Sequence, residues 1–278
     1  MILVFALLTS ASCERDVNNL RYPDFKQKMV ISAFISPDNI NNYISVTSNR
    51  RIYGDLSMHE TLGNLSATLS DNNHEISLDT TGSGFVFRSS DLPVEEGKTF
   101  KLKISSDKGL SAEATCTVPL RRSFSLEVDT FRRFEQVSDD YVYAAFMLNF
   151  YFTDFQGEDN YYRFYCEQTT YHSSYYYPKF TLRYLDLENK YFTDKGKDGD
   201  RSLITTLNID DPKHDDSSFL KVYLLNTDKA YFDFHKSLDK YEGGDDPFTE
   251  ASPVYSNING GLGIFAAYTV DSLIFRLK

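Results

Sequence analysis

The clearest pattern in this chain is the stretch Lys98-Thr-Phe-Lys-Leu-Lys-Ile-Ser-Ser-Asp-Lys-Gly-Leu-Ser-Ala-Glu-Ala-Thr-Cys-Thr-Val118. Apolar residues alternate with Lys and Ser in its first arm, and with Ser, Glu and Thr in its second arm. The turn signal Asp107-Lys-Gly109 separates the two arms. A period of two over both arms is typical of half-buried antiparallel strands. The stretch therefore predicts a β-hairpin with one buried face.

Short strand signals precede this hairpin at close spacing. They are residues 29–35, 44–47, 65–69, 75–78 and 85–87. Turn residues such as Pro37 and Asp71 lie between them, and Pro119 ends the hairpin. About seven short strands within about 90 residues are typical of an immunoglobulin-like or transthyretin-like sandwich. Residues 26–119 are therefore predicted to form an N-terminal β-sandwich domain.

A second β-rich domain is predicted over residues 120–278. Its strand signals are residues 123–130, 142–152, 162–166, 180–185, 203–209, 219–225 and 272–278. One helix is expected over 228–241, because four apolar side chains recur there at spacings of three and four. Thr227 or Asp228 is the expected cap. The predicted fold is all-β, with two sandwich-like domains and one short helix in the second.

The start of the chain resembles a lipoprotein signal. An apolar leader, residues 1–12, ends in small residues directly before Cys13, and polar sequence follows. The leader is far shorter than the roughly 20 residues that span a bilayer. It predicts a cleaved signal, lipid on Cys13, and a polar tether over residues 13–25. The alternatives are an ordinary cleaved signal with an incidental cysteine, or a buried first strand.

Composition limits the partners. The net charge is −11, which argues against binding nucleic acid and against binding anionic lipid head groups by charge. The 20 Tyr and 22 Phe favour strands. Cys116 and Cys166 both fall on inward positions of expected strands. An exported chain could join them in a disulfide, and the alternative is two buried thiols in separate cores.

The motifs of a catalytic site are not evident in this sequence. The five histidines are scattered, and neither a Gly-x-Ser-x-Gly nor a His-Glu-x-x-His motif occurs. We therefore do not expect an enzyme. The best ligand-binding candidates are the tyrosines of one short segment, Tyr171, Tyr175, Tyr176 and Tyr177. Such rings suit glycan or peptide recognition. The alternative is a hairpin whose tyrosines cover the strands beneath them.

Two further loops carry special residue types. Asp194, Asp198 and Asp200 lie with two glycines within seven residues, a composition that suits Ca²⁺. The alternative is a solvated acidic turn, and no other cofactor is expected. The segment Asn257-Ile-Asn-Gly-Gly-Leu-Gly263 predicts a tight turn that leads Ile264 and Phe265 into the core. Its alternative is a ligand-binding loop.

Four motifs resemble those of a known family. They are Val30-Ile-Ser-Ala-Phe-Ile-Ser-Pro-Asp38, Val118-Pro119, Phe152-Thr-Asp-Phe-Gln-Gly-Glu-Asp-Asn-Tyr-Tyr-Arg-Phe164, and Asp246-Pro-Phe248 with Ser256-Asn-Ile-Asn-Gly-Gly-Leu-Gly-Ile-Phe265. On these residues the chain resembles the Bacteroidota outer-membrane lipoproteins known as domain of unknown function 4249.

The resemblance implies an outer-membrane lipoprotein that is often encoded beside a TonB-dependent transporter, and it implies no established enzyme activity. The first functional hypothesis is therefore a lipid-anchored binding or accessory protein of such a transporter in nutrient uptake. A structural or adhesive surface lipoprotein is the second hypothesis. A carbohydrate-active enzyme, for which a pair of carboxylates would be needed, is the third.

Overall fold

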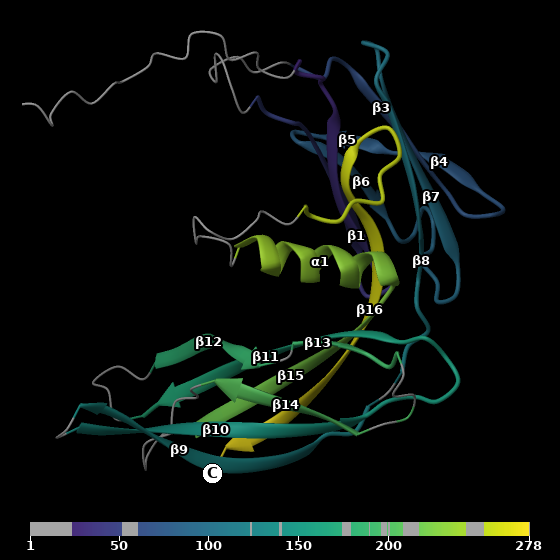
Figure 1. The fold of residues 1–278 in the computed structure, drawn as a ribbon. Helices are drawn as coiled ribbons and strands as arrows, with labels where there is room; N and C mark the ends of the chain where they lie inside the picture. Colours follow the sequence, from purple (N-terminus) through teal and green to yellow (C-terminus); the bar gives the residue numbers. More distant parts are fainter. Residues whose placement is uncertain are drawn as a thin grey trace, which may run out of the picture.

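The computed structural model describes residues 24–51, 61–122, 124–138, 141–173, 179–188, 190–195, 199, 201–207, 217–242 and 253–277. The first eight strands are β1 (Met29–Ile35), β2 (Asn41–Ser48), β3 (Leu65–Ser70), β4 (Glu75–Ser77), β5 (Asp79–Thr81), β6 (Gly84–Arg88), β7 (Thr99–Ser106) and β8 (Ser111–Thr117). They form an N-terminal lobe (Figure 1).

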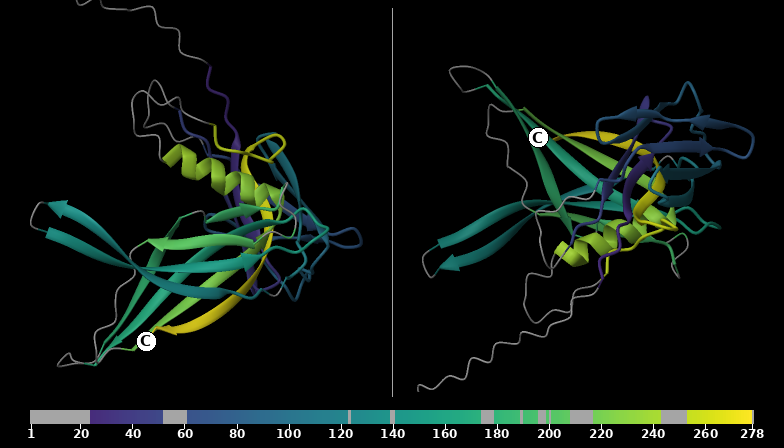
Figure 2. Two further views of the ribbon diagram at one scale, coloured as in Figure 1. Left: turned by 60° about the horizontal axis from the view of Figure 1, so that its bottom comes forward. Right: turned by 90° about the horizontal axis from the view of Figure 1, so that it is seen from above.

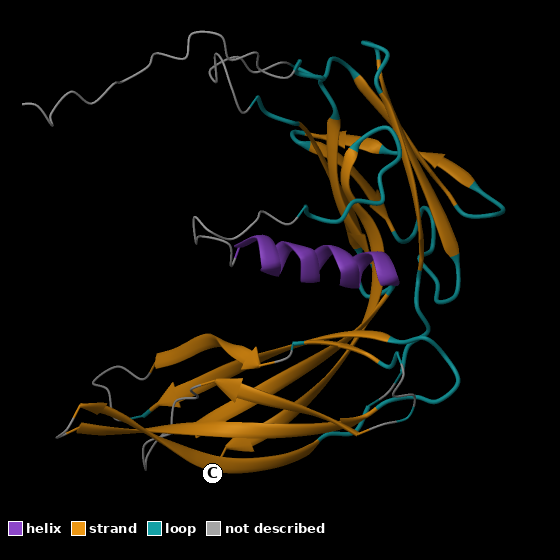
Figure 3. Cartoon of the chain, in the orientation of Figure 1, coloured by secondary structure: helices purple, strands orange, loops and turns teal. Residues whose placement is uncertain are grey.

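The second part contains β9 (Glu127–Ser138), β10 (Tyr141–Thr153), β11 (Tyr161–His172), β12 (Lys179–Glu188), β13 (Tyr191–Thr193), β14 (Arg201–Leu207), β15 (Ser217–Thr227), α1 (Lys229–Glu242) and β16 (Leu262–Leu277). The prediction of an all-β fold with a short helix in its second part is confirmed for the described residues, and Figure 3 shows α1 among the strands. No helix in the described ranges is long and apolar enough to cross a bilayer.

The hairpin predicted from residues 98–118 is β7 and β8. Phe100 pairs with Cys116 and Ile104 pairs with Ala112, and all four side chains are buried. Gly109 has a φ of +82°, which an L-residue rarely adopts, so the turn needs glycine at this position. The buried face of the hairpin packs against β1, β2 and β6 and closes the N-terminal hydrophobic core. The local alternation therefore determined both the strands and their buried face.

The last strand, β16, links the two parts of the molecule. Its first half pairs in parallel with β1, from Leu262 beside Val30 to Ala267 beside Ile35. Its second half pairs antiparallel with β15. One sheet therefore runs through both lobes in the order β5-β6-β2-β1-β16-β15-β11-β12-β14-β10-β9. In Figure 1, β16 runs from the N-terminal lobe down into the C-terminal lobe.

This pairing changes the predicted division of the chain at residues 119 and 120. The link between the lobes lies there, but the N-terminal lobe also contains the beginning of β16. Phe265 and Ala267 are completely buried in the N-terminal core, together with residues of β1 and β7. The strand predicted over 272–278 is therefore only the end of a 16-residue strand.

Three hydrophobic clusters meet on β16. One side of the strand contributes Phe265 to the N-terminal core, and further along contributes Leu277 to the C-terminal core. The other side contributes Ile264 and Ala266 to a third cluster, which lies beneath α1. The C-terminal sheet curls around its own core. The ring centroids of Phe150 on β10 and Phe275 on β16 are 6.3 Å apart, although these two strands are not neighbours in the sheet. The β9–β10 hairpin projects from this lobe (Figure 2).

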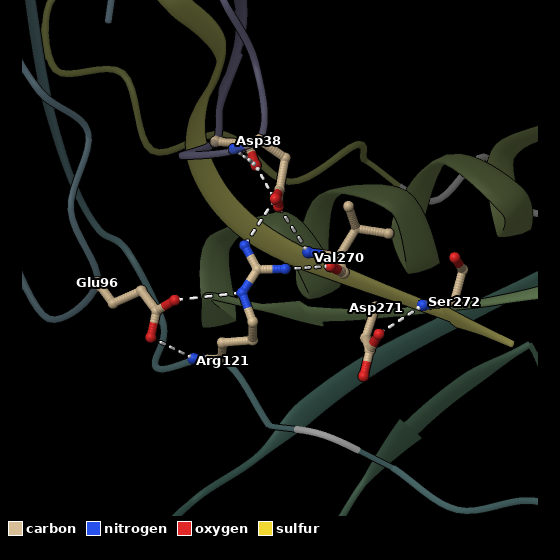
Figure 4. A network of polar contacts seen from close by, with 7 residues as sticks. Asp38, Glu96, Arg121, Val270, Asp271 and Ser272 are labelled. Carbon is tan, nitrogen blue, oxygen red and sulfur yellow. Dashed lines mark hydrogen bonds and ion pairs between the residues drawn. The ribbon is translucent and has the colours of Figure 1, made fainter.

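Arg121, in the link between the lobes, contacts residues of both of them. Its Nη2 lies 2.6 Å from Asp38 Oδ1, and its Nε lies 3.3 Å from Glu96 Oε1. Its Nη1 donates to the carbonyl of Val270 on β16, and Asp38 Oδ2 accepts from the Val270 N–H at 3.1 Å (Figure 4). The four residues tie the β1–β2 turn, the link and β16 together at one point.

Candidate functional site: an exposed aromatic face

One side of the C-terminal sheet presents large apolar side chains to solvent. We call this surface the aromatic face and define it by Tyr171, Phe180, Leu182, Tyr184, Phe219 and Ile274. The exposed fractions of five of them are 74% for Phe180, 58% for Leu182, 69% for Tyr184, 42% for Phe219 and 67% for Ile274. Apolar side chains that gather on one exposed surface mark interaction sites.

The strand register brings these residues together. Phe180 of β12 lies opposite Tyr171 of β11, with ring centroids 5.0 Å apart. The next row runs from Leu182 across β11 to Phe219 of β15. The row after it runs from Tyr184 across to Ile274 of β16, through the positions of Glu167 and Lys221. Because opposite residues in a ladder point to the same face, all six lie on one surface.

Two charged residues, Glu167 and Lys221, lie within the face, between Tyr184 and Ile274. Glu167 Oε2 accepts a hydrogen bond from the Tyr223 hydroxyl at 2.8 Å, and the Lys221 ammonium lies 4.5 Å from the centre of the Tyr223 ring. Tyr223 also stacks on Tyr165, with ring centroids 4.2 Å apart and planes at 12°. Partial burial, then the bond to Glu167, raises the pKa of Tyr223 to about 12, so the phenol keeps its proton at neutral pH.

Helix α1 determines where the face begins. It covers the same side of the sheet nearer the lobe junction, where Tyr165 and Tyr223 pack against the cluster of Leu225 and Tyr231. Beyond the helix, the same side of β16 becomes exposed at Ile274. The face therefore continues the apolar surface that α1 buries. Figure 1 shows α1 lying between the N-terminal lobe and the C-terminal sheet.

Buried polar contacts hold α1 against the sheet beside the aromatic face. Arg163 of β11 donates from Nη1 to the Tyr231 hydroxyl at 2.8 Å, and the same nitrogen lies 3.5 Å from His235 Nε2. Burial, then the nearby Arg163 cation, lowers the pKa of His235 to about 4, so the imidazole is neutral at pH 7. Phe34 of β1 stacks on His235 with centroids 5.2 Å apart. The helix thus packs on both lobes through one cluster.

The sequence located this site only in part. Tyr171 lies on the aromatic face and is partly buried, whereas Tyr175, Tyr176 and Tyr177 lie outside the described residues. Phe180, Leu182, Tyr184, Phe219 and Ile274 were not among the predicted ligand residues. Alternation in β12 separates Phe180, Leu182 and Tyr184 from their neighbours, but it does not say which side faces solvent.

Of the three aspartates in the predicted calcium loop, the structure describes Asp194. Asp194 is buried, and its Oδ2 accepts from the Asn160 N–H at 2.9 Å. Asp198 and Asp200 lie outside the described residues, so calcium binding stays a prediction. In the part of the chain that the structure describes, no group of three or more His, Cys, Asp or Glu side chains is arranged to hold a metal ion.

The possible disulfide is not formed. Cys116 and Cys166 are both free and buried, and they belong to different hydrophobic cores, one in each lobe. Burial raises the pKa of the Cys116 thiol well above its usual value and that of Cys166 to about 12, so both thiols are protonated at neutral pH. The structure agrees with the alternative of two buried thiols in separate cores.

The glycine-rich segment before β16 forms the predicted tight turn. Gly263 has a φ of +103°, and a Cβ there would lie 2.0 Å from the carbonyl oxygen of Ile31. Asn257 brackets the turn, because its side chain donates to the Phe265 carbonyl at 2.7 Å and accepts from the Phe265 N–H at 3.0 Å. Ile264 and Phe265 are completely buried.

A polar groove lies beside the same turn. Its volume is about 530 Å³, and its lining includes Ser66, Lys103, Ser111, Glu113 and Asn259. Glu113 forms an ion pair with Lys101 at 2.8 Å, which lowers the pKa of the carboxyl. The groove lies on the solvent side of β3, β7 and β8 and has the size of a small-molecule site. It lacks the aromatic side chains found on the opposite lobe.

Cys13 and residues 14–23 lie outside the described residues, so lipidation and the tether remain predictions. A comparison with curated proteins gives no match. A family model described as "Domain of unknown function (DUF4249)" matches residues 16–274, which is nearly the whole chain and includes both lobes. The family indicated by the four motifs is confirmed, and the chain belongs to the DUF4249 family, whereas the bacterial group and the lipid anchor stay predictions.

Proposed function

We propose that this protein is a lipid-anchored binding or accessory protein of the bacterial outer membrane that works with a TonB-dependent transporter in nutrient uptake. The observation that carries the proposal is the aromatic face. Burying one large apolar side chain is favourable by about 1.5–3 kcal/mol. Five such side chains exposed on one surface therefore provide a strong driving force for association with another molecule.

The expected anchor supports a partner in the same membrane. Lipid on Cys13 and a tether to residue 25 would keep the two lobes close to the bilayer surface. The net charge of −11 disfavours binding to anionic head groups, so the anchor and a protein partner must provide the membrane association. Aromatic and apolar residues are typical of the centre of protein–protein interfaces.

A structural or adhesive surface lipoprotein is the second candidate function. The same aromatic face suits contact between copies of this chain, because exposed apolar patches also mark protein–protein contacts. A carbohydrate-active enzyme remains a third proposal, and the polar groove contributes one carboxylate, that of Glu113, to the pair that it would need.

Affinity purification from native membranes tests the first proposal. We expect the wild-type protein to retain a TonB-dependent barrel, and the triple variant Phe180→Ser, Leu182→Ser, Tyr184→Ser to lose most of it. The control is Ile40→Ser with Tyr43→Ser, since these side chains are 81% and 62% exposed on the other lobe. A wild-type protein that reproducibly retains no such barrel would contradict the proposal.

A further inference from the structure

The polar groove of the N-terminal lobe extends over two adjoining cavities. The main cavity, of about 530 Å³, lies on the solvent side of β3, β7 and β8 and reaches Asn259 and Gly260. A second cavity, of about 180 Å³, continues it past Thr115, and both are lined by Glu113 and Asn259. Together they have the volume of a small-molecule site. Figure 1 shows that β3, β7 and β8 belong to the lobe that does not carry the aromatic face.

The shape of the groove follows from small side chains in one row of the sheet. Ser66, Ser105 and Ser111 are direct neighbours across β3, β7 and β8. The hydroxyls of Ser66 and Ser105 are 2.8 Å apart. The neighbouring row on the same side of these three strands has longer side chains, those of Thr68, Lys103 and Glu113. The serines therefore form a low floor, and the longer side chains border it.

Backbone contacts hold the end of the groove in place. Asn259 and Glu113 exchange two backbone hydrogen bonds, at 2.9 and 2.8 Å. Gly260 has a φ of +77°, and a Cβ there would lie 2.4 Å from the carbonyl oxygen of Ser111. Glycine is needed for this close approach of the turn to β8. The wall is thus preorganised, which lowers the entropic cost of binding a ligand.

Lys103 places an ammonium group in the groove. Its direct neighbour across the two strands is Glu113. The Glu113 carboxylate, however, lies 2.8 Å from the Lys101 ammonium, and Lys101, then the Asn259 side chain, lower the pKa of Glu113. None of the ion pairs formed among the described residues includes Lys103. An ammonium without a carboxylate partner, beside hydroxyl donors, suits an anionic group.

The lining limits the class of ligand. Ile104 and Ala112 border the groove, but their side chains are buried on the other side of the sheet. The described lining therefore offers polar side chains and backbone, and an apolar ligand would gain little from it. A nucleobase would find no aromatic ring to stack on. Hydroxyls both donate and accept hydrogen bonds, so the Ser and Thr side chains match a ligand with many hydroxyls.

We propose that the groove binds an acidic sugar. The carboxylate or phosphate group of the sugar pairs with Lys103, and its hydroxyls bond to the serine row and to Asn259. Glu113 is held ionised by Lys101 and accepts hydrogen bonds from sugar hydroxyls. Binding needs no second carboxylate, unlike glycoside cleavage. The site lies on the N-terminal lobe, so it is independent of the partner proposed for the aromatic face.

Isothermal titration calorimetry on the full chain in detergent tests the proposal with two acidic probes, tri-galacturonate and glucose 6-phosphate. We expect the wild-type protein to bind at least one of them, and the comparison shows which acidic group fits. Lys103→Ala should weaken this binding by about tenfold or more, because a charge-assisted contact is lost. Ser105→Leu should also weaken it by about tenfold, because the larger side chain fills the floor of the groove.

Matched substitutions outside the groove are the controls. Lys28→Ala removes the same charge from an exposed position beside β1, and Thr117→Leu places the same apolar side chain at an exposed position of β8. Both variants should bind like the wild-type protein, and circular dichroism verifies that every variant is folded. The proposal is wrong if neither acidic probe binds, if neutral maltotriose or inorganic phosphate binds as tightly, or if Lys103→Ala changes nothing.

Discussion

Asp228 joins the helix to the sheet through a single carboxylate. Its Oδ1 accepts the Tyr231 N–H at 2.7 Å, which caps the start of α1, and its Oδ2 accepts the Ala267 N–H of β16 at 3.1 Å. Burial raises the pKa of Asp228 to about 7, although both backbone N–H groups favour the ionised form. Of the two caps expected from the sequence, Thr227 and Asp228, the structure uses the second.

Replacement of Asp228 by Ala should destabilise the protein by about 2 kcal/mol, because one helix cap and one sheet contact are lost together. Urea unfolding followed by circular dichroism measures this change. Asp233→Ala is the matched control on the same helix, where the carboxylate pairs with Lys229 at i,i+4 on the surface. That pair contributes about 0.3–0.5 kcal/mol. Equal effects of the two substitutions would contradict the capping role.

At the level of elements, the sequence predicted strands best where they have one buried and one exposed side. The β7–β8 hairpin and β11 alternate clearly, and both were expected. The first half of β16 was not expected as a strand, because Ile264, Phe265, Ala266 and Ala267 are all buried and show no alternation. The helix covers one side of this run and the N-terminal core covers the other, and neither neighbour is local in sequence.

The candidate site was harder to predict than the strands that carry it. The pattern in β12 separates Phe180, Leu182 and Tyr184 from Thr181 and Arg183, but alternation alone does not say which set is buried. In the structure, Leu185 on the opposite side of the strand is buried in the core, whereas Phe180, Leu182 and Tyr184 are exposed. Which side is covered depends on the curl of the sheet and on where α1 ends. Both are tertiary properties.

For the whole molecule, the shared strand predicts that the lobes unfold together. β16 contributes to all three hydrophobic clusters, and Arg121 ties the link to it. The reactivity of the two buried thiols measures the unfolding of each lobe, because Cys116 lies in one core and Cys166 in the other. Pulsed alkylation at increasing urea concentrations, read by peptide mass spectrometry, should show both cysteines becoming reactive at the same midpoint. Two clearly separated midpoints would show that the lobes are independent.

In the native membrane, we expect a partner to cover the aromatic face. Hydroxyl-radical footprinting tests it most directly, by comparing side-chain oxidation in native outer membranes with that in the protein purified in detergent. We predict severalfold protection of Phe180, Leu182, Tyr184 and Ile274 in the membranes, and unchanged oxidation of Ile40 and Tyr43 on the other lobe. Ile274 is decisive, because it lies on β16, three strands away from β12, so its protection requires a partner that covers the width of the face. Equal oxidation of Ile274 in both preparations would contradict the claim.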